Sequence, residues 1–114
     1  MGIIAESWLL DERVQLKVHR LSGAHRLAGA LSLGVPKLGE ALMFRNCRSV
    51  HGWFMGACLD VVFVDSGGRV LRTADLAPWR IKTCARASHC LELAAGECSR
   101  LGIATGSILK NISK

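Results

Sequence analysis

The stretch that most strongly indicates the fold covers residues 59–73 and reads LDVVFVDSGGRVLRT. Its first part, Leu59–Val64, is a run of β-branched and aromatic side chains, and residues 70–73 have the character of a returning strand. The turn between them, DSGG at residues 65–68, contains two glycines, which adopt positive φ angles at no steric cost. The stretch therefore predicts a β-hairpin.

Toward the N-terminus, a second clear strand is predicted over Val14–Leu21, where apolar and polar side chains alternate. This period of two places the even-numbered side chains, Arg20 included, on one face, as a half-buried strand requires. Residues 40–44 and 50–55 are predicted to form two short strands separated by a polar turn. A helix is predicted over residues 23–33, although its glycines weaken it.

Toward the C-terminus, proline near the start of residues 78–82 favours a short edge strand there. Residues 89–93 alternate again and predict a strand with leucines on one face. Residues 94–101 are predicted to be helical, with Gly102 as the glycine that ends the helix. A last strand over residues 107–112 would complete the sheet.

Together these elements predict an α+β fold that is mostly β. Short strands with turn signals about every ten residues are typical of a small mixed or antiparallel sheet curled into a partial barrel. One short helix is expected near residues 95–101 and a second near 23–33. The chain has 114 residues, which is the size of one domain, so residues 1–114 are predicted to share a single core.

Composition gives further expectations about the class of protein. Lysine and arginine number 15 against nine acidic residues, so the net charge of +6 favours anionic partners. The chain lacks an apolar run long enough for a membrane span, and residues 1–10 lack the features of a signal peptide, so we expect a cytoplasmic location. The five cysteines form no C-x-x-C pair, which predicts reduced and mostly buried thiols, with Cys58 and Cys90 in the core.

Four stretches carry a resemblance to a known family: GEALMFRNCRSVHGWFM, LDVVFVDSGGRVLR, APWR and CLELAAGECSRLGIATGSIL. In this order they resemble the domain of unknown function 192 family (UPF0127), over about residues 39–110, while residues 1–38 match it poorly. The resemblance implies a small β-rich fold with a helix and brings no established activity, substrate or cofactor. This chain departs from the family at Gly56 and Cys58, where relatives usually carry a basic residue and a proline.

Six residues form the candidate ligand-binding site. His51, Met55 and Asp60 lie within ten residues of one another, and a carboxylate can orient an imidazole that binds a ligand or acts as a general base. The alternative is structural: Met55 fills the core and Asp60 accepts backbone hydrogen bonds. The other three candidates are Trp79, Arg80 and Glu92. Arg80 is expected either to form an ion pair with Asp60 or Glu92, or to form with these two acids and Trp79 an open polar cleft with an aromatic wall.

Other patterns of reactive side chains predict no chemistry. A zinc site built from His51, Cys58, Cys84, His89 and Cys90 lacks the close ligand pairs that zinc sites use. No cysteine lies in a nucleophile motif, and the turn at residues 65–68 does not match a phosphate-binding fingerprint. Trp8, Trp53 and Trp79 are too few to indicate a stacking platform for bases. We therefore predict no catalytic residue, no metal and no cofactor.

The favoured function is a noncatalytic accessory module that binds a small anionic ligand or a protein partner. The alternative is a basic nucleic-acid-binding domain, which predicts arginines gathered on one face and salt-sensitive affinity. A hydrolytic enzyme ranks third, because the sequence names no nucleophile. The identity of the ligand and the oligomeric state are left open by the sequence.

Overall fold

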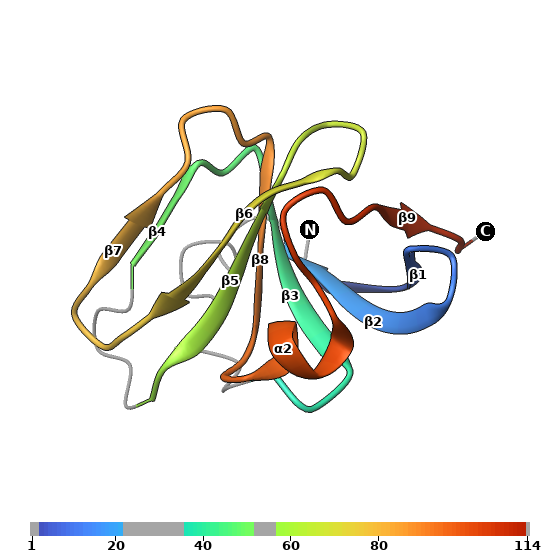
Figure 1. Cartoon of the computed structure of the whole chain (residues 1–114), viewed down its shortest axis with the longest axis horizontal. Helices are drawn as coiled ribbons and strands as arrows, with labels where there is room; N and C mark the ends of the chain where they lie inside the picture. Colours follow the sequence, from blue (N-terminus) through green and yellow to red (C-terminus); the bar gives the residue numbers. More distant parts are fainter. Residues whose placement is uncertain (1–2, 22–35, 52–56, 114) are drawn as a thin grey trace.

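A computed structural model describes residues 3–21, 36–51 and 57–113 of the chain. Figure 1 shows a strongly curled sheet with a short helix lying across it. The strands and the helix have these bounds: β1 Ile3–Leu10, β2 Val14–Leu21, β3 Glu40–Arg45, β4 Ser49–His51, β5 Leu59–Val64, β6 Val70–Leu76, β7 Ile81–Thr83, β8 His89–Ala94, α2 Glu97–Leu101 and β9 Leu109–Asn111.

Seven of the strands form one mixed sheet in the order β6-β5-β8-β3-β2-β1-β9. The neighbours are antiparallel except β2 and β3, which run parallel. Strands β4 and β7 form a separate two-stranded ribbon. The sheet curls into a half-barrel, so the predicted mixed, partly closed sheet is confirmed.

The two ends of the sheet meet at a seam formed by residues 68–70 and 106–109. The backbone N–H of Val70 donates to the carbonyl of Ser107 at 2.8 Å, and the N–H of Leu109 donates to the carbonyl of Gly68 at 2.8 Å. Gly68 has φ of 88°, and a Cβ atom there would lie 2.1 Å from the carbonyl oxygen of Leu109. The seam therefore depends on a residue without a side chain at position 68.

Two apolar clusters pack on the two faces of the sheet. The inner cluster, on the concave face, joins residues from both sheet edges, such as Val70 and Leu109, and packs against α2. The outer cluster, on the other face, lies against the β4–β7 ribbon. Strand β8 contributes to both, because Leu91 faces inward and Cys90 faces outward, as its alternation predicts.

Several predicted elements are confirmed. Strand β2 has the predicted bounds, the hairpin of β5 and β6 forms as expected, and β8 extends the predicted strand by one residue. The last strand is present but short, covering Leu109–Asn111 of the predicted 107–112. Strand β4 begins one residue early, and the rest of the predicted strand 50–55 lies outside the described residues, as does the predicted helix 23–33.

Three predicted features were wrong in their placement. The helix begins at Glu97 instead of residue 94, because Gly96 has φ of 87° and Ala94 is still paired in β8. The edge strand begins at Ile81 instead of residue 78, because the backbone turns at Trp79 with φ of 64°. Cys58 was expected in the core and is exposed.

Strand β1 was not predicted. It pairs along its whole length with β2 in an antiparallel hairpin. Its connection to β2 passes through Asp11 and Glu12, which have φ of 49° and 61°. Glycine, asparagine and aspartate tolerate positive φ, so Asp11 is a weak turn signal, but Glu12 is not one and no glycine marks the turn.

The five cysteines are free thiols, and Cys90 is buried as predicted. The prediction of mostly buried thiols was wrong, because Cys47, Cys84 and Cys98 are only half-buried. Within the described ranges, no helix has the length and apolar character needed to cross a membrane.

Candidate functional site

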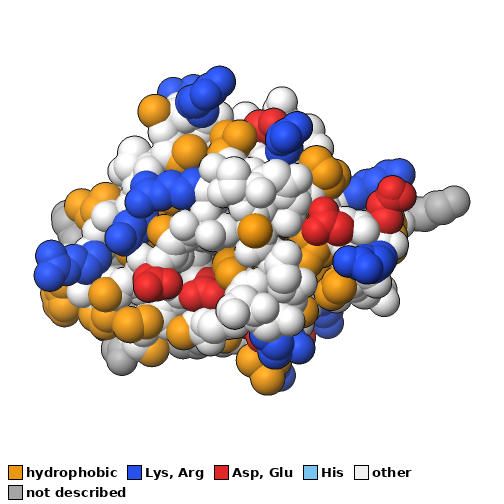
Figure 2. Space-filling model, viewed as in Figure 1, with side chains coloured by type: hydrophobic (Ala, Val, Ile, Leu, Met, Phe, Trp, Pro, Cys, Tyr) orange, Lys and Arg blue, Asp and Glu red, His pale blue; other side chains and the backbone are white. Residues whose placement is uncertain are grey.

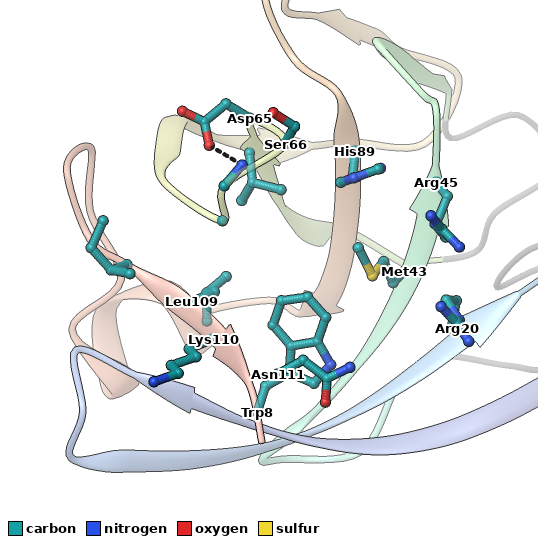
Figure 3. Close-up of a pocket in the computed structure, with 14 residues that line it drawn as sticks. Trp8, Arg20, Met43, Arg45, Asp65, Ser66, His89, Leu109, Lys110 and Asn111 are labelled. Carbon is teal, nitrogen blue, oxygen red and sulfur yellow. Dashed lines mark hydrogen bonds between the residues drawn. The ribbon is translucent and has the colours of Figure 1, made fainter. Parts of the chain in front are cut away.

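A cleft of about 510 Å³ opens at one end of the half-barrel, between the turn that joins β5 to β6 and the strands β1 and β9. We call it the mouth cleft. Figure 3 shows Met43 lying among Arg20, Arg45 and His89, with Trp8 next to it. Met43 and Leu109 are buried, whereas Arg45 is exposed.

The strands bring polar side chains to one level of the concave face. Side chains two residues apart on a strand share a face, so the inner cluster continues toward the mouth into Arg20 on β2, Arg45 on β3 and His89 on β8. Arg20 lies opposite Met43, and Arg45 lies directly opposite His89. On each of these strands, the last apolar side chain of the inner cluster is therefore followed, two residues further toward the mouth, by a basic residue or a histidine.

Glu6 of β1 positions two side chains of the mouth cleft. Its Oε1 accepts a hydrogen bond from the indole Nε1 of Trp8 at 3.2 Å, and its Oε2 lies 3.4 Å from the Arg20 guanidinium. The Glu6 side chain is only 10% exposed, so the pair with Arg20 is partly shielded from water. Glu6 therefore fixes the indole ring and neutralises one of the cations.

His89 stands in the neutral form near neutral pH. Burial lowers its pKa, and the positive charge of Arg45 lowers it further. The His89 Nδ1 accepts a hydrogen bond from the backbone N–H of Asn46 at 3.1 Å. In a neutral imidazole the proton then lies on Nε2, which is available to donate to a bound group.

The glycine turn at the rim uses its own backbone donors. The Oδ1 atom of Asp65 accepts hydrogen bonds from the N–H groups of Gly67 and Arg69, both at 2.9 Å. The N–H of Gly68 donates to the carbonyl of Asp65 at 3.1 Å. Figure 3 shows Asp65 folded over the turn. The turn therefore uses the N–H groups of Gly67, Gly68 and Arg69 within itself.

The structure separates two of the predicted site residues, Asp60 and Glu92. Asp60 lies opposite Leu93, and Glu92 lies opposite Val61, so the two carboxyl groups point to opposite faces of the sheet. Asp60 is 8% exposed, and its Oδ2 accepts a hydrogen bond from the N–H of Cys98 at 2.9 Å. This bond to the first turn of α2 matches the structural interpretation of Asp60.

Glu92 is buried on the outer face beside Leu42 and Val61, and burial raises the pKa of its carboxyl group to about 7. Trp79 and Arg80 are exposed in the turn before β7. The backbone of His51 lies close to that turn because His51 pairs with Ile81. Met55 lies outside the described residues. Among the described residues, the ion pairs do not join Arg80 to Asp60 or Glu92.

The residues of the mouth cleft were not predicted to lie together. The alternation of β2 already placed Arg20 on the apolar face, and this was the one local signal of a basic rim. Trp8 and His89 were considered only as a base-stacking ring and a zinc ligand. Their common location follows from pairings between strands that are far apart in the chain.

A second cleft of about 530 Å³ lies between α2 and the start of β5, and Asp60, Asp75, Cys58 and Cys98 line it. Burial raises the pKa of the Cys98 thiol to about 12, with a further contribution from the Asp60 carboxylate. This thiol is therefore a poor nucleophile. In the part of the chain that the structure describes, no three histidine, cysteine or acidic side chains are arranged to hold a metal ion.

Sequence comparison gives two matches. Residues 26–111 match the DUF192 family model, which is described as "Uncharacterized ACR". The curated UPF0127 protein PH1112 of Pyrococcus horikoshii is 43% identical over 58 residues. That alignment covers 46% of this chain and 50% of the relative, so it spans about half the relative's length.

Two solved structures share the fold. A protein of Sinorhizobium meliloti 1021, described as a "putative transcription regulator", superposes with a TM-score of 0.81 at 22% identity, covering 97% of this chain and 96% of that one. A protein of unknown function from Novosphingobium aromaticivorans superposes with a TM-score of 0.74 at 18% identity, covering 95% and 84%. At these identities the similarity supports the half-barrel architecture alone.

Proposed function

This chain belongs to the DUF192 (UPF0127) family, and because that family is uncharacterised we propose a function from the geometry: a noncatalytic module that binds a small anionic ligand in the mouth cleft. The observation that carries this proposal is the change, along the concave face, from the apolar inner cluster to a rim containing Arg20, Arg45 and His89. A concave site with apolar walls and a few convergent polar groups is the usual form of a small-molecule site.

The chemistry of the rim supports binding and gives no support to catalysis. Arg45 and the neutral His89 are hydrogen-bond donors on adjacent strands, and they can hold a negative group together. A hydrolytic site would need a nucleophile next to a base. The described residues that line the mouth cleft include no cysteine, and the one serine, Ser66, lies exposed in the glycine turn.

The alternative of a nucleic-acid-binding domain predicts one continuous basic surface. On the face drawn in Figure 2, lysine and arginine side chains stand in several separate groups. Phosphate contacts that hold nucleic acid are normally many and aligned, so this face does not favour the alternative. Titration with a short oligonucleotide tests the nucleic-acid alternative directly.

Replacing Arg45 by glutamine is expected to weaken the binding of small anions by about tenfold or more, because a charge-assisted hydrogen bond is lost. Isothermal titration of acetate, benzoate and inorganic phosphate measures the effect. Arg86→Gln is the matched control, since Arg86 is exposed and does not line the cleft. Two results together would support the nucleic-acid alternative instead. The two variants would weaken anion binding equally, and a short oligonucleotide would bind tightly with an affinity that falls steeply as salt is added.

Replacing Glu6 by glutamine is expected to strengthen the binding of small anions, which is the opposite of the effect of Arg45→Gln. The amide oxygen still accepts the hydrogen bond from Trp8, but the charge that neutralises Arg20 is removed. Anion affinity should then rise about threefold or more at low ionic strength. Glu12→Gln, in the exposed β1–β2 turn, removes the same charge away from the cleft and should change affinity much less. Identical gains in both variants would contradict a specific role for Glu6.

A further inference from the structure

We propose that the ligand of the mouth cleft is a planar carboxylic acid, whose carboxylate binds Arg45 and His89 and whose flat apolar part lies against Trp8. This inference rests on the proposed anion-binding function and adds the chemical class of the ligand. Three features of the cleft support it: the occupied donors of the glycine turn, the single arginine without an ion pair, and the orientation of the indole ring.

The first feature disfavours a phosphate ligand. Proteins commonly hold phosphate with backbone N–H groups of a glycine-rich turn, and the mouth cleft has such a turn at its rim. In this chain the N–H groups of Gly67 and Arg69 are both bound by Asp65 Oδ1, and that of Gly68 is bound by the Asp65 carbonyl. The Asp65 carboxylate also places a negative charge where a phosphate would lie.

The second feature is the charge available to a ligand. Two cations of the concave face line the cleft, Arg20 and Arg45, whereas Lys110 follows the inward-facing Leu109 and its side chain lies on the opposite face of β9. Glu6 pairs with Arg20 at 3.4 Å, and none of the ion pairs among the described residues involves Arg45. One arginine without an ion pair matches a monoanion such as a carboxylate better than a dianion such as a phosphate monoester.

The donors that remain have the geometry of a carboxylate site. The planar guanidinium of Arg45 offers parallel N–H groups that match the two oxygens of a carboxylate. His89 lies directly across from Arg45, and its Nε2–H is available because Nδ1 is already an acceptor. Together they provide enough donors for a carboxylate.

The third feature is the shape of the apolar part. Glu6 holds the Trp8 indole through Nε1, so the ring has a fixed orientation at the base of the cleft. Met43 and Leu109 belong to the inner cluster and form the apolar surroundings. A flat ring can stack against indole and contact the methionine sulfur at the same time. These contacts favour an aromatic or conjugated acid over a short aliphatic one.

The test compares four probes by isothermal titration and by NMR chemical shifts: benzoate, acetate, benzamide and phenyl phosphate. Benzoate is expected to bind at least about tenfold tighter than acetate or benzamide, and no weaker than phenyl phosphate. Trp8→Leu should abolish the advantage of benzoate over acetate, while Leu38→Ala, an exposed apolar side chain away from the cleft, should preserve it. Trp8→Phe retains a ring and should keep most of the preference, and thermal melting checks that each variant is folded.

The outcomes separate the two proposals. One set of results would contradict the planar carboxylic acid as the ligand class but still support an anion site. In that case phenyl phosphate binds more tightly than benzoate, or acetate and benzoate bind equally, and Arg45→Gln loses affinity. Binding that is insensitive to Arg45→Gln, or absent for every anion, would overturn the proposed function and the ligand class with it.

Discussion

Replacing Gly68 by alanine is expected to destabilise the chain by on the order of 4 kcal/mol, which corresponds to a fall in melting temperature of roughly 15 °C. Two effects combine. At φ of 88° any residue with a Cβ atom is strained, and here that atom would lie 2.1 Å from the carbonyl oxygen of Leu109. The atom that blocks the new Cβ belongs to the backbone and cannot rotate away as a side chain could. The two sides of the seam therefore have to separate and lose their hydrogen bonds.

Gly106→Ala is the matched control. Gly106 lies in the same seam and has φ of 96°, but a Cβ atom there would meet nothing within 4 Å. Its substitution should cost only about 1 kcal/mol, the penalty of the left-handed backbone conformation. Thermal and urea unfolding of both variants measure the difference. Equal costs at the two positions would show that the close approach at the seam does not limit stability.

Replacing Glu92 by glutamine is expected to remove a pH dependence of stability and to stabilise the chain by about 3 kcal/mol at pH 8. Burial raises the pKa of Glu92 from 4.5 to about 7. Above pH 4.5 the unfolded carboxyl group loses its proton, while the folded one keeps it until about pH 7. The stability due to this group is therefore full below pH 4.5 and is lost as the pH rises through 7. Glutamine is never charged and has nearly the same shape.

Urea unfolding of wild type and variant across this pH range measures the difference directly. The two curves should agree near pH 4.5 and diverge until about pH 7. Glu12→Gln, at an exposed position, is the control and should follow the wild-type curve. A constant difference between wild type and Glu92→Gln across the range would mean that the Glu92 carboxyl group is ionised in the folded chain.

Local patterns were sufficient to predict much of the fold. Strand β2 was found because its side chains alternate, and the hairpin of β5 and β6 because glycines mark its turn. These signals involve residues that are close together in the chain, so they can be read from a single sequence. Strand β1 carried a weaker signal, since the turn at Asp11 and Glu12 contains no glycine and only Asp11 is a common turn residue.

The site could not be predicted in the same way. Asp60 and Glu92 were grouped as possible partners of Arg80 or as members of one polar cleft, but the pairing of β5 with β8 places the two side chains on opposite faces of the sheet. The mouth cleft combines Trp8, Arg45 and Lys110, which come together only through long-range pairing. Their proximity is a property of the topology rather than of any short pattern.

The pairing of the first strand with the last one determines the order in which the molecule can be assembled. Leu10 of β1 lies opposite Leu109, and Trp8 opposite Asn111. During synthesis on a ribosome, β1 is made well before β9, so this edge of β1 cannot pair with β9 until residues 109–111 have been added. Contacts between such distant parts of a chain form slowly, and unpaired edges invite association with other chains. Trp8 and Lys110 both line the mouth cleft, so this end of the cleft is complete only once β1 and β9 have paired.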